Sequence, residues 1–145
     1  MKINLKYGID QLVFGMKQSD VIAIYGKPNR NYKDEDDNVI YSYNTLKMCL
    51  TFYKDEDFKL GYIVASSSEM ELFENKVIGK KISVVKSQLN TKGITKFTQE
   101  EFDTFENYFN EDNWIIFQTE FDEVVKFEIG AIINDKDEFD WKFKG

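Results

Sequence analysis

Short segments in which apolar and polar residues alternate fill much of this chain, and charged turns separate them. In segments 48–53 and 59–65 the apolar residues fall at every second position, as a strand with one buried face requires. The charged segment 54–57 between them is typical of a tight turn, and segment 39–43 is rich in aromatic and β-branched residues. The pattern therefore predicts an antiparallel meander of three strands.

A short helix is predicted immediately before this meander, starting near residues 17–19. Apolar residues at helical spacing, Val21 and Tyr25 among them, give the segment one apolar side. Gly26 supplies a left-handed stop, and Pro28 prevents the helix from continuing. The helix is therefore expected to end at Gly26.

The same order of elements returns in the second half of the chain. Gly79 leads into a second predicted helix within 77–90, and three more strands are expected at 106–109, 114–119 and 123–133. With an offset of 65 residues, five apolar positions match in pairs: Leu50 with Ile115, Phe52 with Phe117, Leu60 with Val125, Tyr62 with Phe127 and Val64 with Ile129. This recurrence indicates an internal duplication.

The fold class that follows is α+β. We expect one domain over residues 1–145, in which two helix-then-antiparallel-meander repeats form one sheet with the short helices packed on one face. The expected boundaries are about 8–66 for repeat one, about 73–133 for repeat two and about 138–144 for a C-terminal edge strand. The edge strand is predicted because Phe139, Trp141 and Phe143 alternate with charged residues.

Charge is distributed unevenly along the chain. Residues 1–97 carry 15 basic and 12 acidic side chains, whereas residues 98–145 carry 4 basic and 14 acidic side chains. A face with this excess of acids repels nucleic-acid phosphates and anionic lipid, and it speeds encounters with a basic partner. We therefore expect no nucleic-acid partner and no membrane partner.

The remaining sequence signals point to the cytoplasm. The chain has no run of 18 apolar residues, no apolar signal-peptide core and no lipobox cysteine near its start. Its single cysteine, Cys49, lies in an apolar stretch and is expected to be a buried, inert thiol in a reducing compartment.

Few residues suit catalysis. The chain contains no histidine, the commonest general base and metal ligand, so Cys49 has no histidine to activate it. The sequence has no glycine-rich phosphate loop, and the acidic run 34–37 lacks the glycine and the distant glutamate of an EF-hand. We therefore expect no enzymatic activity, no metal and no cofactor.

Residues 14–28 resemble the signature G-M-[ST]-x-x-[ED]-V-x-x-x-[LFY]-G-x-P of the SmpA/OmlA family and of the β-lactamase inhibitory protein fold. The matching positions are Gly15, Met16, Val21, Gly26 and Pro28. The corresponding segment 78–89 keeps the glycine and the helix but lacks the closing Gly-x-Pro. The resemblance implies repeats of short helices followed by antiparallel strands, in proteins that mostly bind other proteins.

The resemblance and the acidic last third together predict a cytoplasmic immunity protein. Such a protein binds and neutralises a cognate, basic bacterial toxin by blocking its active site or substrate cleft, and many such toxins are basic nucleases. Two alternatives stay open: a non-enzymatic assembly or scaffold module of the same fold, and a small-ligand-binding protein. The sequence does not specify the oligomeric state.

The expected partner-binding residues combine aromatic anchors with acids that steer the encounter. They are Tyr108, Trp114, Phe121 and Trp141, with Glu111, Asp112, Glu120, Asp122 and Glu123.

Overall fold

A computed structural model describes all 145 residues as a mostly β fold with two short helices, which is compatible with the predicted α+β class. The helices are α1 (Gln18–Tyr25) and α2 (Ile82–Asn90). The longer strands are β4 (Arg30–Lys33), β5 (Val39–Tyr43), β6 (Met48–Tyr53), β7 (Lys59–Ala65), β10 (Thr98–Glu101), β11 (Glu106–Asn110), β12 (Ile115–Glu120) and β13 (Glu123–Gly130). The short strands are β1 (Lys2–Asn4), β2 (Gly8–Ile9), β3 (Leu12–Val13), β8 (Glu71–Leu72) and β9 (Asn75–Lys76), and a 3₁₀ turn covers Lys54–Glu56.

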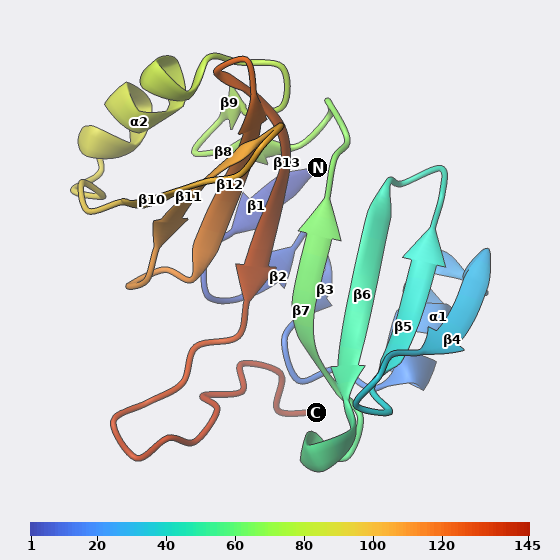
Figure 1. Ribbon diagram of the computed structural model, residues 1–145. Helices are drawn as coiled ribbons and strands as arrows, with labels where there is room; N and C mark the ends of the chain where they lie inside the picture. The colour runs from blue at the N-terminus through green and yellow to red at the C-terminus, as the bar shows by residue number, and fades with distance from the viewer.

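Eight strands form one continuous sheet in the order β10-β11-β12-β13-β7-β6-β5-β4. Every neighbouring pair in this sheet is antiparallel. The sheet therefore consists of two four-stranded meanders, which join along β7 and β13 (Figure 1). Helix α1 precedes the first meander and α2 precedes the second.

A second, smaller sheet has the order β3-β2-β1-β8-β9. Its strands are antiparallel except for β1 and β8, which pair in parallel. The expectation of a single sheet is therefore corrected. These strands are two or three residues long, too short to show the alternation from which strands are predicted.

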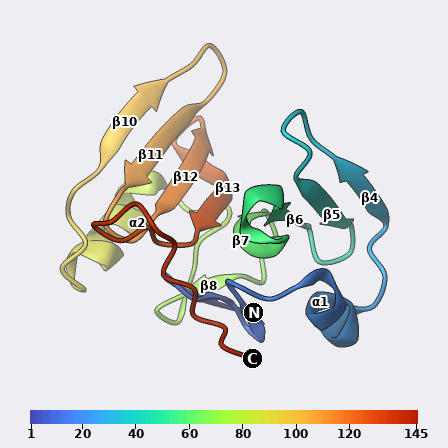
Figure 2. The same cartoon turned by 90° about the horizontal axis from the view of Figure 1, so that it is seen from below.

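One face of the eight-stranded sheet carries the core, and α1, α2 and the small sheet lie on that side (Figure 2). Alternate residues of the central strands point inward, so Leu50, Phe117 and Phe127 are fully buried. Val21 of α1 and Val85 of α2 belong to the same cluster of 29 buried apolar residues. We call the opposite side of the sheet the open face, because no helix covers it.

The first helix ends as predicted. Gly26 follows α1 with a φ of 76°, in the region that glycine adopts most readily, and its amide donates to the Ile22 carbonyl. At the other end, the Lys17 amide donates to the Asp20 carboxylate over 2.9 Å. The helix therefore begins and ends where local chemistry satisfies its backbone.

The predicted C-terminal edge strand is wrong, because residues 138–144 form no strand. Phe139 makes only an isolated bridge with Ile133. Its ring stacks on that of Trp141 at 4.7 Å, and the Phe143 amide donates to the Phe14 carbonyl over 3.0 Å. The alternating aromatic residues thus reflect packing against the rest of the fold and not a sheet.

Candidate functional site

Three aromatic side chains meet on the open face where the second meander joins the first. Trp114 lies in the turn between β11 and β12, with its ring 4.4 Å from that of Phe109 and 6.4 Å from that of Tyr62. Both contacts are edge-to-face, a favoured geometry for aromatic pairs. We call Tyr62, Phe109 and Trp114 the aromatic trio.

A glycine makes room for this trio. Gly130 lies opposite Tyr62 in the ladder between β13 and β7, and the Trp114 ring covers it. A Cβ atom at position 130 would lie 2.2 Å from Trp114 Cδ1, which is too close for any side chain. Glycine inside a strand commonly marks such a close approach.

The Tyr62 hydroxyl is fixed by a carboxylate on the neighbouring strand. It donates a hydrogen bond to Glu128 Oε1. Burial of the ring, followed by this hydrogen bond and the Glu128 charge, raises the pKa of Tyr62 far above its ordinary value. Tyr62 therefore stays a neutral donor at physiological pH and anchors one side of the trio.

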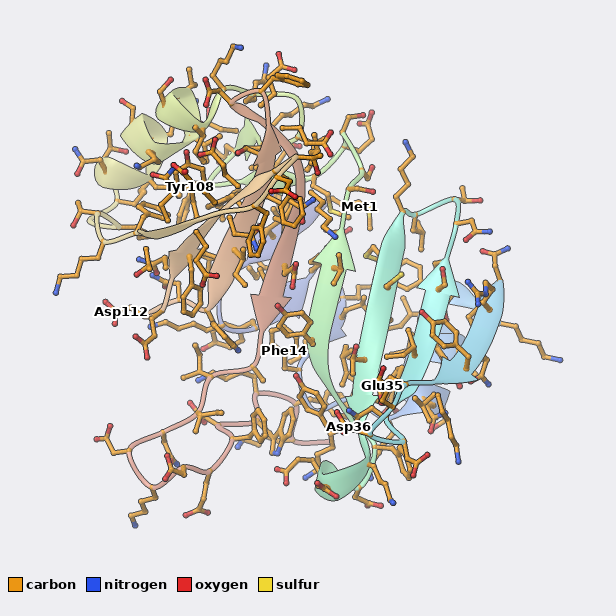
Figure 3. All side chains as sticks on the ribbon, viewed as in Figure 1. Met1, Phe14, Glu35, Asp36, Tyr108 and Asp112 are labelled. Atoms are coloured by element: carbon orange, nitrogen blue, oxygen red, sulfur yellow. The ribbon has the colours of Figure 1, made fainter.

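A cavity of about 480 Å³ opens beside the trio, between the β11–β12 turn and the segment that follows β13. We call it the acidic aromatic pocket. It is lined by Phe109, Glu111, Asp112, Trp114, Ala131, Ile132, Ile133 and Asp135. Figure 3 shows Asp112 projecting outward from the β11–β12 turn.

The three carboxylates of the pocket lack a partner of opposite charge. The salt bridges of the structure involve other acids, and no cation lies within 4 Å of Glu111, Asp112 or Asp135. On the neighbouring part of β11, the buried Asn107 Oδ1 accepts no hydrogen bond. The pocket thus joins an apolar floor to three carboxylates without a cation beside them, which suits a cationic group on an apolar stem.

The predicted site residues divide into separate groups. Glu111, Asp112 and Trp114 come together at the pocket. Four others from this meander, Glu120, Phe121, Asp122 and Glu123, form the hairpin turn at the opposite end of β12. Their distance from the pocket along the strand makes the hairpin tip a separate surface.

Tyr108 does not suit the predicted role of an exposed anchor. Its side chain is 6% exposed and lies in the core, and Figure 3 shows it within the second meander. Its hydroxyl donates to Glu106 Oε2 over 2.9 Å. Burial and this hydrogen bond raise the pKa of Tyr108 to about 12. Tyr108 therefore stabilises the sheet.

Trp141 lies in the C-terminal segment, apart from the pocket. Besides stacking on Phe139, its ring has the Lys59 ammonium 5.6 Å from its centroid. Phe139 in turn packs against Tyr53 at 5.6 Å. These contacts give Trp141 a structural role in holding the C-terminal segment against the fold.

Sequence reasoning missed Phe109, Gly130, Ile133 and Asp135. Ile133 is 50% exposed and lies in a loop that follows the last strand. The signal that could have located the site was Gly130, a glycine within a strand pattern. The path of the loop after β13 was not predictable from local patterns.

Phe121 has an unfavourable backbone conformation at the hairpin tip. It is 96% exposed with a φ of 50°, and Asp122 follows with a φ of 66°. Turns of this kind favour Asn and Gly, so Phe121→Asn should raise the free energy of unfolding by roughly 0.5–1 kcal/mol. Urea denaturation measures this, and a loss of stability would show that the exposed ring makes stabilising contacts.

The structure shows no group of three or more His, Cys, Asp or Glu residues that could hold a metal ion. In the acidic loop 34–37, Asp34 Oδ1 instead accepts hydrogen bonds from the Asp36 and Asn38 amides, at 2.9 and 3.0 Å. Neither helix has the length and the apolar character needed to cross a membrane.

No protein-family model and no curated protein matches this chain. Among solved structures, the fold is similar to an extracellular protein containing an SCP domain from Bacillus anthracis strain Ames, with 14% identity and a TM-score of 0.51. A cysteine-rich secretory protein from Staphylococcus aureus Mu50 follows, with 16% identity and a TM-score of 0.48. Each match covers 79% of this chain and 42% of the other protein. The chain thus spans less than half the length of these proteins.

This similarity corrects three expectations. The fold is similar to that of the Bacillus anthracis protein, so the SmpA/OmlA and β-lactamase-inhibitory-protein assignment is wrong. That protein is described as extracellular, so the predicted cytoplasmic location and immunity function are not supported. The matched signature encodes a glycine-bounded helix, and such a helix start and stop can occur in unrelated folds.

Proposed function

We propose that this chain is a non-catalytic binding module whose acidic aromatic pocket takes a basic segment of another protein. The observation that carries the proposal is a pocket with an aromatic floor and three carboxylates that have no cation beside them. Lysine and arginine side chains match it, since their stems are apolar and their charged ends seek carboxylates and aromatic faces.

We also infer that the two meanders arose by duplication, and equivalent backbone contacts support this. The Gly15 amide donates to the Leu60 carbonyl over 2.9 Å, and the Gly79 amide donates to the Val124 carbonyl over 2.8 Å. Gly79 follows Gly15 by 64 residues and Val124 follows Leu60 by 64 residues, and both glycines have positive φ angles, 109° and 85°. On this inference Leu60 corresponds to Val124, whereas the offset of 65 pairs it with Val125.

If the two meanders are duplicates, the β5–β6 turn can be compared with the β11–β12 turn that borders the pocket. Lys47 in the β5–β6 turn corresponds to Trp114, with φ angles of 53° and 50°. The Ser66 amide donates to the Lys47 carbonyl over 3.0 Å, as the Gly130 amide donates to the Trp114 carbonyl over 3.1 Å. The same backbone is thus built with Lys and Ser in one half. The β5–β6 turn thus adopts this backbone without a tryptophan or a glycine, which favours a role in binding for Trp114 and Gly130.

The acidic charge of the pocket should raise the rate of association more than it stabilises the final complex. The last third of the chain, which includes the pocket, carries 14 acidic and 4 basic side chains. Such an excess attracts a basic segment over distances near the Debye length and weakens with salt. The aromatic floor supplies the contact that is insensitive to salt.

Titration with a hexalysine peptide tests the proposal. The chain has two tryptophans, so Trp141→Phe leaves Trp114 as the sole tryptophan emitter. We expect saturable quenching or a shift of Trp114 emission. Replacing the three pocket acids (Glu111→Gln, Asp112→Asn and Asp135→Asn) should weaken binding by roughly tenfold, since each exposed pair contributes up to about 1 kcal/mol.

The matched control removes three charges at the hairpin tip, through Glu120→Gln, Asp122→Asn and Glu123→Gln. Both triple variants have the same net charge, so non-specific attraction would weaken equally in both. We expect the tip variant to bind within threefold of the parent protein. Equal losses in both variants, or no change in Trp114 emission, would contradict the proposal.

A further inference from the structure

The two outer strands of the eight-stranded sheet carry opposite charges. Strand β4 contributes Arg30 and Lys33 and no acid, while β10 contributes Glu100 and Glu101 and no base. All four residues of each strand are exposed, and each strand is hydrogen-bonded to a neighbour on one side only. Figure 1 shows the two strands at opposite ends of the sheet.

None of these charges is paired within the chain. The salt bridges of the structure involve neither strand. The Arg30 guanidinium lies 4.7 Å from the centroid of the exposed Tyr32 ring, where it remains available to an acid. Two free sheet edges of opposite charge on one molecule are complementary surfaces.

The strand order allows these edges to meet. Because the sheet has eight strands and every neighbouring pair is antiparallel, β4 and β10 run in opposite directions. A second copy in the same orientation therefore places its β10 antiparallel to β4 of the first copy. The open faces of the two copies then lie on the same side.

The alternation of side chains fits a definite register. Following directly opposed residues across the seven ladders leads from Arg30 to Thr98, so Arg30, Thr98 and Glu100 point to the open face. Pairing Arg30 of one copy with Glu100 of the next keeps the faces matched.

We propose that this chain associates head to tail with a second copy, through β4 of one molecule and β10 of the other. Like edges repel: two β4 strands would bring Arg30 and Lys33 together, and two β10 strands would bring acids together. The opposite edges attract and complete each other's backbone hydrogen bonds. The remaining free edges allow a ring or an open chain.

Charge reversal tests this contact in the full chain by sedimentation velocity over a concentration series at low salt. The parent protein should show a sedimentation coefficient that rises with concentration and falls back as salt is added. Arg30→Glu alone and Glu100→Arg alone should each lower the association constant by roughly tenfold or more, because like charges then face each other.

Two further samples, in which opposite charges face each other again, make the test specific. The double variant with both reversals should associate like the parent protein, and so should an equimolar mixture of the two single variants. Lys136→Glu and Glu138→Arg, in the exposed C-terminal segment, control for net charge. The proposal is wrong if the parent protein stays monomeric, or if neither the double variant nor the mixture restores association. Hexalysine binding at the pocket is a separate measurement and does not depend on this result.

Discussion

Phe117→Ala should lower the free energy of unfolding by about 3–5 kcal/mol, the usual cost of truncating a buried phenylalanine. Phe117 is fully buried in β12, where its ring lies 6.4 Å from that of Phe97. The truncation removes the free energy gained by burying the ring, and it leaves a cavity whose neighbouring side chains lose their packing contacts. Since natural domains are stable by only about 5–15 kcal/mol, much of the fold's stability should disappear.

The matched control is Phe121→Ala, four residues further along the same hairpin. Because Phe121 is 96% exposed, its truncation should change stability by no more than about 0.5 kcal/mol. Urea denaturation of both variants measures the difference, with the slope of the unfolding curve as a check on two-state behaviour. Equal losses would show that the hairpin does not pack as described.

Gly130→Ala should disable the pocket while leaving the rest of the fold in place. The added methyl group would lie 2.2 Å from Trp114 Cδ1 and 2.3 Å from Trp114 Nε1, so the indole ring must move. Displacing a ring in this way costs about 1–3 kcal/mol of stability, as overpacking usually does. With its aromatic floor displaced, the pocket should bind hexalysine about tenfold more weakly.

Emission from Trp114 in the Trp141→Phe background reports both effects. The emission maximum should shift to longer wavelength as the indole leaves its contacts with Phe109 and Tyr62. Ser66→Ala is the matched control, because the Ser66 amide donates to the Lys47 carbonyl of the β5–β6 turn and Ser66 already carries a Cβ atom. Unchanged emission and affinity in Gly130→Ala would show that Trp114 does not form the floor.

Local patterns predicted the longest elements well. The apolar alternation gave β6 and β7, and Gly26 gave the end of α1, because burial on one face and a left-handed stop leave clear traces in the sequence. Strands β4 and β10 show no alternation of apolar and polar residues, since all their residues are exposed. Their positions are set by backbone pairing with β5 and β11, which does not depend on side-chain pattern.

The candidate site was predictable only in part. Composition and charge drew attention to Glu111, Asp112 and Trp114, which the fold brings to one pocket. The same reasoning selected Tyr108, because an aromatic residue in a strand gives no sign of which face it occupies until the register is known. Asp135 joins the pocket through the path of the chain after β13, a tertiary feature with no local signal.

Amide and indole NMR spectra of the labelled protein during hexalysine titration test most directly whether the acidic aromatic pocket binds a basic segment. We expect the largest shifts from the Trp114 indole and from the backbone of Phe109, Ile133 and their pocket neighbours, with smaller shifts at the acids of the hairpin tip. Shifts spread evenly over acidic residues of both regions, or concentrated at residues 120–123, would contradict a binding role for the acidic aromatic pocket.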